Sequence, residues 1–294
     1  MSASAAAAAT TPSLHKGRDW VGLTFAAYLI LSLGVGFAML AALLVDVLRD
    51  GLPSLSWTLL SEGPSIDPAK AGARPAILST LYMGALLLAF TIPLGVGTAV
   101  YLEEYAQKDK WYNRLLELNI QNLAGVPSIV YGILGLAFLV RGVGLGRVLL
   151  AGALILTLLV LPTVIVAARE AIRAVPDSIR QGAFALGATK WQVVSKQVLP
   201  ASIPGIATGT ILALSRAIGE TAPLLLVGAV AFVSFNPTLL GSFTALPIQI
   251  FQWIERPQQE FKDLAAAAII VLLVMLLGLN AVAIWLRNRY QQRW

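Results

Sequence analysis

Six long apolar stretches constrain this chain more than any other feature. They run approximately over residues 20–47, 77–102, 123–140, 148–168, 203–233 and 264–286. About 20 helical residues cross a bilayer, and a backbone in lipid must satisfy its own hydrogen bonds. Because 57% of the residues are hydrophobic and only 12% are charged, lipid must solvate much of the surface. We therefore predict an all-α polytopic membrane protein with six transmembrane helices.

Two stretches are interrupted, and two connections stand out. The third stretch contains Gly-Val-Pro-Ser at 125–128, and the fifth contains two prolines. Such breaks need neighbouring helices or a water-filled path to satisfy the freed carbonyls. The Gly-, Pro- and Ser-rich connection at 46–76 predicts irregular structure. The apolar segment at 245–254 is too short to cross, so we expect it at the membrane interface or re-entrant, with Trp253 as an interfacial anchor.

Lysine and arginine are concentrated in the connections on one side of the predicted spans. The positive-inside rule then places both termini in the cytoplasm. Residues 1–13 lack a signal sequence's basic region, and we expect residues 1–19 to be a disordered cytoplasmic tail. We divide the rest into a first transmembrane helix with its outer loop (20–76) and a transmembrane domain (77–294).

The composition argues against several kinds of chemistry. The chain has no cysteine, and its single histidine, His15, lies in the polar tail. We therefore expect no thiol nucleophile, no metal site and no resident cofactor. The net charge of +6 flanks the apolar stretches, so we interpret it as a topology signal and expect a lipid bilayer, not nucleic acid, as partner.

The polar connection at about 169–202 has the pattern of two short helices. Pro176 suits a first helical turn, and Gly187 allows a sharp turn before a second helix over 189–199, which Pro200 ends. One apolar face of the first helix is formed by Ile179, Ala183 and Leu186. Such a helix either docks into a groove on a partner protein or lies on lipid headgroups, and periodicity alone leaves both open.

This connection resembles the EAA loop of bacterial ABC importer permeases, with Gln181 where that family has glutamate. The resemblance implies a type I ABC importer permease fold whose coupling helix sits in a cleft of a cytoplasmic ATPase. The coupling residues it implies are Gln181, Gly182, Ala183, Leu186, Gly187, Leu199 and Pro200. Because the sequence contains no Gly-x-x-x-x-Gly-Lys-Ser/Thr loop, we expect ATP and Mg²⁺ on a separate ATPase and no enzyme activity in this chain.

Arg216 and Glu220 place two charges inside the fifth apolar stretch. Arg216 follows Ile203 by 13 residues, roughly 20 Å along a helix, so we expect it to be buried in the membrane. Residues four apart share a helix face and can pair. The pair either locks neighbouring helices together or faces a pathway, where ionisable groups in spans usually lie. A guanidinium matches an oxyanion, and Ser215 and Thr221 add hydroxyls nearby.

The run Arg-x-x-Gly-Glu-Thr-Ala-Pro-Leu-Leu from 216, with Gly-Val-Pro-Ser-Ile-Val-Tyr-Gly at 125–132, resembles the A-type permease subunits of bacterial phosphate importers. The resemblance implies a bacterial inner membrane, inorganic phosphate as cargo, and a role for Arg216 and Glu220 in transport. It also implies a heterodimer with a C-type permease, two ATPase copies and an extracytoplasmic phosphate-binding protein. Ser128 and Tyr131 are candidates for the wall of the path, although small residues in this motif commonly just let helices approach.

Three other functions stay open at this point. The same positive site would serve a permease for sulfate, molybdate or tungstate. A membrane-embedded enzyme would need a nucleophile with a base, or a metal cluster. A passive channel would conduct without an ATPase.

Overall fold

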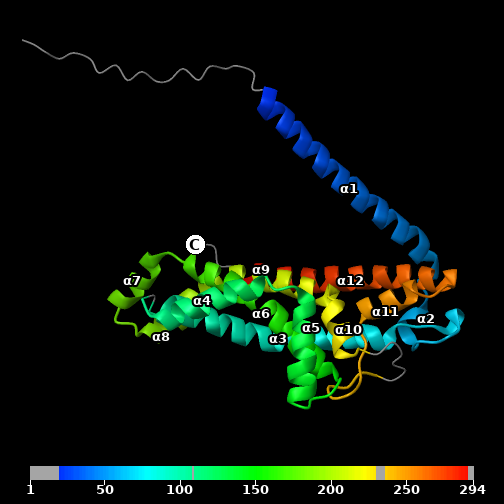
Figure 1. Cartoon of the computed structure of the whole chain (residues 1–294). Helices are drawn as coiled ribbons and strands as arrows, with labels where there is room; N and C mark the ends of the chain where they lie inside the picture. The colour runs from blue at the N-terminus through cyan, green and yellow to red at the C-terminus, as the bar shows by residue number, and fades with distance from the viewer. Residues whose placement is uncertain (1–19, 108, 230–235, 291–294) are drawn as a thin grey trace, which may run out of the picture. The chain divides into compact units, whose positions relative to one another are not determined.

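The computed structural model describes residues 20–107, 109–229 and 236–290, so the predicted tail lies outside it. Every regular element in these ranges is helical (Figure 1). The α-helices are α1 (Trp20–Ser54), α2 (Trp57–Ser61), α3 (Arg74–Val100), α4 (Trp111–Ala124), α5 (Ser128–Gly135), α6 (Leu149–Arg173), α7 (Asp177–Ala185), α8 (Lys190–Val193), α9 (Leu199–Gly219), α10 (Ala222–Val227), α11 (Leu246–Ile254) and α12 (Gln259–Tyr290).

Three π turns and one 3₁₀ turn complete the described elements. The π turns extend α3, α5 and the start of α9, and the 3₁₀ turn follows α2. They are η1 (Pro68–Lys70), η2 (Tyr101–Tyr105), η3 (Leu136–Gly142) and η4 (Val194–Val198).

The helices match the predicted spans, with breaks in the third and in the fifth. Five are long and apolar enough to cross a membrane, and α4 with α5–η3 makes a sixth candidate, bent by 107°. The expectation of a third span over 123–140 is wrong in its boundaries, because α4 already begins at Trp111. Hydropathy misses this helix, since its polar residues Asn113 and Glu117 lower the average. The Gly-Val-Pro sequence at 125–127 then supplies the bend.

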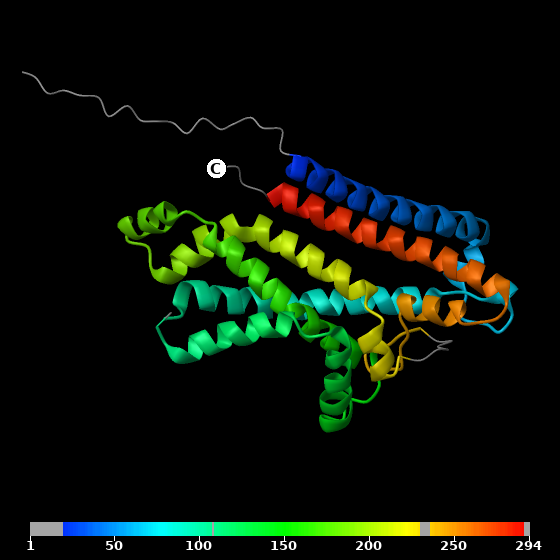
Figure 2. The same cartoon turned by 45° about the horizontal axis from the view of Figure 1, so that its top comes forward.

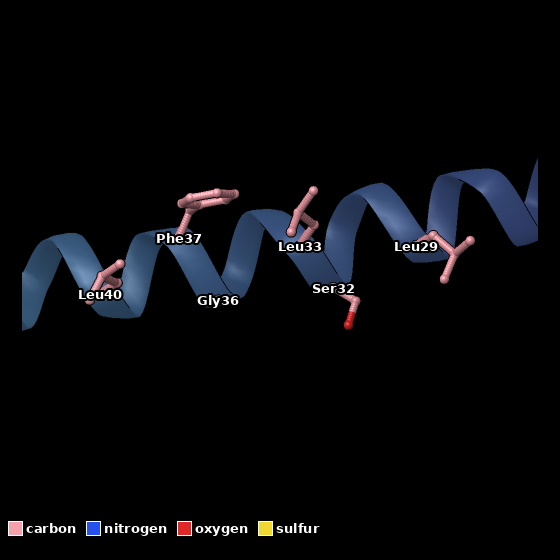
Figure 3. A pocket seen from close by; sticks show the side chains of 6 residues that line it. All are labelled: Leu29, Ser32, Leu33, Gly36, Phe37 and Leu40. Carbon is pink, nitrogen blue, oxygen red and sulfur yellow. The ribbon is translucent and has the colours of Figure 1, made fainter. Parts of the chain in front are cut away.

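Residues 20–46 form a unit of their own, made of the first part of α1. In the most apolar 18-residue segment of α1, no residue is buried. Four large side chains project from α1 with Ser32 and Gly36 between them along the helix: Leu29, Leu33, Phe37 and Leu40 (Figure 3). The helix continues to Ser54, seven residues beyond the predicted span.

In the second unit, residues 47–294, α6 is the central helix and packs against both α3 and α9. Small residues allow this packing. A Cβ at Gly209 would lie 2.2 Å from the Cβ of Ala167, and one at Gly205 would lie 2.5 Å from that of Ala171. Within this unit, α7 and α8 lie at one end, and α2 and α11 at the other (Figure 1, Figure 2).

Two expectations for the end near α11 are wrong. Trp253 is only 1% exposed and packs against Phe261, so it is a core residue and no interfacial anchor. The backbone N–H of Leu246 donates to Thr80 Oγ1 at 2.9 Å, which attaches α11 to α3. The connection at 46–76 is also largely ordered, because α1 continues into it, α2 and η1 follow, and Leu59 is fully buried. Tertiary packing thus covers segments whose composition indicates surface.

Candidate functional site

Arg216 and Glu220 lie where α9 ends. Arg216 Nε is 3.5 Å from Glu220 Oε1, so the pair that the spacing predicts is present. The side chains are 47% and 18% exposed in the isolated chain, and the depth of Arg216 in the membrane stays a prediction. Arg216 belongs to an exposed stripe of α9 with Thr208, Leu212 and Gly219, at spacings of three and four residues. A partner or a pathway can reach this guanidinium.

The chain leaves the helical conformation three residues after Arg216. α9 stops at Gly219, Glu220 is extended (φ −74°, ψ 126°), and α10 begins at Ala222. The fifth predicted span is therefore broken, and its predicted last residues, 230–233, lie outside the described residues. Non-helical backbone at membrane depth is tolerated where it is buried in protein or lines a water-filled cavity.

The two motifs singled out in the sequence meet in space. α5 packs on α10 so closely that a Cβ at Gly132 would lie 2.7 Å from Pro223 Cα. Tyr131 is buried, and its hydroxyl donates to the carbonyl of Leu123 at 2.8 Å across the bend between α4 and α5. Gly132 thus serves close packing beside the Arg216–Glu220 pair.

The hydroxyl residues of the site are placed differently from one another. Ser215 Oγ is 2.9 Å from both the Ile211 carbonyl oxygen and Asn280 Oδ1, so it joins α9 to α12. Ser128 begins α5, Thr221 precedes α10, and both are half-buried. Among the residues that the structure describes, no group of three or more His, Asp or Glu could hold a metal ion.

The predicted pair of short helices in the 169–202 connection is largely confirmed. α7 starts directly after Pro176, and Gly187 adopts the left-handed conformation (φ +79°) that a sharp turn requires. Thr189 caps α8 through a capping box with Gln192. The expected break at Pro200 is wrong, because one helix runs from Lys190 to Gly219. Pro200 has no backbone N–H to donate. The π turn η4 directly precedes it and shifts the backbone hydrogen bonds there, so that the helix can continue.

The three residues of the predicted apolar face of α7 do not share one surface. Ile179 and Ala183 pack inward against a buried cluster around Ile172 and Val198. Leu186 is 91% exposed, because α7 ends at Ala185 and the chain turns there. Phe184, which the periodicity missed, is exposed as well. The exposed surface of this turn also includes Gln181, Gly182 and Gly187.

A cluster of ion pairs beneath α7 was not predicted from the sequence. Arg169 is 8% exposed, lies 2.8 Å from Glu103 and also pairs with Glu117. Glu103 accepts a second pair from Arg173 at 2.8 Å. These partners join α3–η2, α4 and α6, and lie too far apart in the chain for any local pattern to reveal them.

A second set of contacts attaches α7 to the same end of the bundle. Arg180 pairs with Glu104 at 2.9 Å and donates to the carbonyls of Val175 at 2.6 Å and Ile172 at 2.9 Å. Both charged side chains are largely buried, at 17% and 10% exposure. α7 is therefore linked to η2 and to the end of α6.

Residues 91–294 match the family described as binding-protein-dependent transport system inner membrane component. The chain is 33% identical over 270 residues to the probable ABC transporter permease protein YqgI of Bacillus subtilis, covering 86% of this chain and 92% of that one. It is 32% identical over 278 residues to the phosphate transport system permease protein PstA of Yersinia pestis, covering 92% of each. The inward-facing MetNI methionine ABC transporter shares the fold, with a TM-score of 0.60 at 18% identity over 75% of this chain and 96% of that one. The chain therefore belongs to the family of binding-protein-dependent transport system inner membrane components.

Proposed function

We propose that this chain is a permease subunit of an ATP-driven phosphate importer and forms half of its translocation path. Relatives from Yersinia pestis and Mycobacterium tuberculosis are named phosphate transport system permease proteins, at 32% identity. The fold of an ABC importer permease and several apolar spans support the same role. In this role the chain moves a solute and catalyses no reaction.

The availability of Arg216 carries this proposal. Among the described residues its one carboxylate partner is Glu220, 3.5 Å away at the limit of a hydrogen bond, and about half of the Arg216 side chain is exposed. A guanidinium presents a planar fork of donors that phosphate oxygens can accept in pairs. Glu220 occupies the arginine between transport events, and the arriving anion replaces it.

We assign each proposed partner of the path to one of the exposed surfaces. A C-type permease faces the Arg216 stripe of α9 and completes the path. An extracytoplasmic phosphate-binding protein delivers the anion at the end of the bundle that carries α2 and α11. The opposite end, with α7 and α8, faces the cytoplasm together with both termini, as the distribution of basic residues favours.

Two copies of an ABC ATPase bind at this cytoplasmic end, one of them on α7. The exposed Phe184 and Leu186 supply an apolar contact that a groove on the ATPase can bury. When the ATPase dimer closes, α7 moves, and the Arg180–Glu104 pair transmits that movement to α3. Gln181 contributes an uncharged contact where related permeases have glutamate.

Phosphate uptake by the complete transporter tests the path. Arg216→Gln should lower uptake by about 100-fold, as expected for loss of a preorganised charged donor, while the subunits still co-purify. Arg141→Gln, at an exposed arginine near the end of η3, is the matched control and should transport normally. Normal uptake by Arg216→Gln would disprove the role of Arg216.

ATP hydrolysis tests the cargo. Phosphate, presented with its binding protein, should stimulate hydrolysis by the complete transporter. Stimulation by sulfate or molybdate with their binding proteins, and none by phosphate, would show another oxyanion to be the cargo.

A further inference from the structure

Arg287, near the end of α12, contacts the same exposed stripe of α9 that carries Arg216. Its Nη1 donates to Thr208 Oγ1 at 3.1 Å. Thr208 lies eight residues before Arg216, with the exposed Leu212 between them. Residues four apart share a helix face, and eight residues span about 12 Å of helix. Two guanidinium groups therefore lie along one accessible stripe.

The contact with Thr208 belongs to a polar seam between α9 and α12. Ser215 Oγ lies 2.9 Å from Asn280 Oδ1 in the same seam. Seven residues separate Thr208 from Ser215 on α9, and seven separate Asn280 from Arg287 on α12. Because seven residues make about two helical turns and the order is reversed, the two helices run antiparallel in one register. The packing of α12 on α9 thus fixes where Arg287 meets the stripe.

Arg287 has only neutral partners among the residues that the structure describes. Besides Thr208, its Nε and Nη2 share Asn288 Oδ1 at 3.3 Å, and no described carboxylate forms a salt bridge with it. A guanidinium has five N–H donors, so donors remain for an anion. Arg289, two residues further on, lies over the Trp285 ring of its own helix. Arg287 thus differs from its neighbour in bringing an uncompensated charge to α9.

We propose that Arg287 is a second binding position for the transported anion, between Arg216 and the end of the bundle that carries α7 and α8. The helix over Lys190–Gly219 begins at that end, so Thr208 lies nearer to it than Arg216 does. A path conducts when its sites bind the solute well enough to admit it and weakly enough to release it, and several sites meet both needs.

This inference rests on the proposed function, because it needs an anion that reaches Arg216 first. When Glu220 returns to Arg216, the released anion moves about 12 Å along the stripe to Arg287. Thr208 holds the second guanidinium in place for it.

Phosphate uptake by the complete transporter tests the second position. Arg287→Gln should lower the maximal rate about tenfold, as expected for a lost hydrogen bond between charged groups. The phosphate concentration for half-maximal uptake should stay the same, because the anion meets Arg216 first. Arg287→Lys keeps the charge and should recover most of the rate, and Arg289→Gln is the matched control and should transport normally. Normal uptake by Arg287→Gln, or an equal loss in Arg287→Lys, would overturn the proposal.

Arg216→Gln in the same assay separates this inference from the proposed function. Loss of uptake in Arg216→Gln with normal uptake in Arg287→Gln would overturn only the second position. Normal uptake in both variants would overturn the roles of both arginines. Loss of the C-type subunit during purification of Arg287→Gln would show that Arg287 binds that subunit, which would overturn its role as an anion site.

Charged thiol reagents test whether anions reach the stripe between the two arginines. The chain has no cysteine, so Leu212→Cys introduces one thiol, whose modification mass spectrometry of this chain can follow. In the complete transporter, an anionic methanethiosulfonate should react about fivefold faster than a cationic one, each relative to its rate with a free thiol, because two positive charges lie nearby. Arg287→Gln should reduce this preference, and Arg289→Gln should not. A thiol that reacts with neither reagent, or a preference unchanged by Arg287→Gln, would overturn the proposal.

Discussion

The arginines at the α7 end and the arginine at the end of α9 are held in opposite ways. Arg169 is 8% exposed and pairs with two glutamates from two other elements. Arg216 is about half exposed, and its one pairing partner, Glu220, is 3.5 Å away on its own stretch of chain. Arg216 stands in an apolar span, where an uncompensated central charge costs about 2.5–3.5 kcal/mol, whereas Arg169 stands near the polar end of α6.

We propose that this difference separates arginines that hold the fold from an arginine that binds the transported anion. A guanidinium already saturated by carboxylates has few donors left for a ligand, and it holds helices together. A guanidinium with one weak partner can exchange it for a passing anion at little cost. The comparison predicts that removing charge at the α7 end affects stability, and that removing it at Arg216 affects transport.

The largest effect on stability is expected from Arg169→Met. Breaking a buried pair by removing one partner typically costs about 3–5 kcal/mol, and we expect about 3 kcal/mol here because Glu103 keeps Arg173. The midpoint of thermal unfolding of the purified complex should fall accordingly. Glu170→Gln is the control, since Glu170 is 65% exposed and pairs with Arg173 at 3.3 Å. Equal midpoints for the two variants would mean that the buried cluster does not hold the bundle.

Exchanging the charges of Arg180 and Glu104 tests whether the α7 end also transmits movement. Each single reversal should destabilise α7 by about 2 kcal/mol, as for lost hydrogen bonds to charged groups. ATP hydrolysis should continue while phosphate uptake per ATP falls. The double variant Arg180→Glu/Glu104→Arg should recover part of both, although the bonds to the carbonyls of Val175 and Ile172 stay lost. No recovery in the double variant would argue against direct coupling.

The packing beside Arg216 should be less sensitive. Gly132→Ala introduces a Cβ 2.7 Å from Pro223 Cα and should cost about 1–2 kcal/mol by overpacking, with reduced uptake. Gly125→Ala, in the same motif, meets nothing closer than 3.5 Å and should be tolerated. The midpoint of thermal unfolding and phosphate uptake should be measured for both variants. Equal values for the two variants would show that the close α5–α10 contact contributes neither to stability nor to uptake.

The smallest effect on stability is expected at the site itself. Arg216→Gln and Glu220→Gln should each change the free energy of unfolding by less than about 1 kcal/mol, because exposed pairs contribute little. The same thermal measurement used for Arg169→Met provides the comparison. A large loss of stability in Arg216→Gln would show that Arg216, like Arg169, holds the fold together.

Much of the fold follows from local chemistry. Hydropathy locates five spans, Pro176 marks the start of α7, and Gly187 marks its turn. Hydropathy fails at α4, which combines lipid-compatible length with a polar face. Composition fails at Trp253, which α11 buries against Phe261.

The sequence by itself determined that this chain is a helical membrane protein with a charged pair inside its fifth span, because apolar length and i,i+4 spacing are properties of neighbouring residues. Only the tertiary structure decided what each arginine contacts. Glu103 and Arg169 are 66 residues apart, and Glu104 and Arg180 are 76 apart. Such pairs form only when packing of α3, α6 and α7 brings their ends together. The same packing leaves Arg216 accessible, and this accessibility is the reason for proposing Arg216, and not Arg169, as a site.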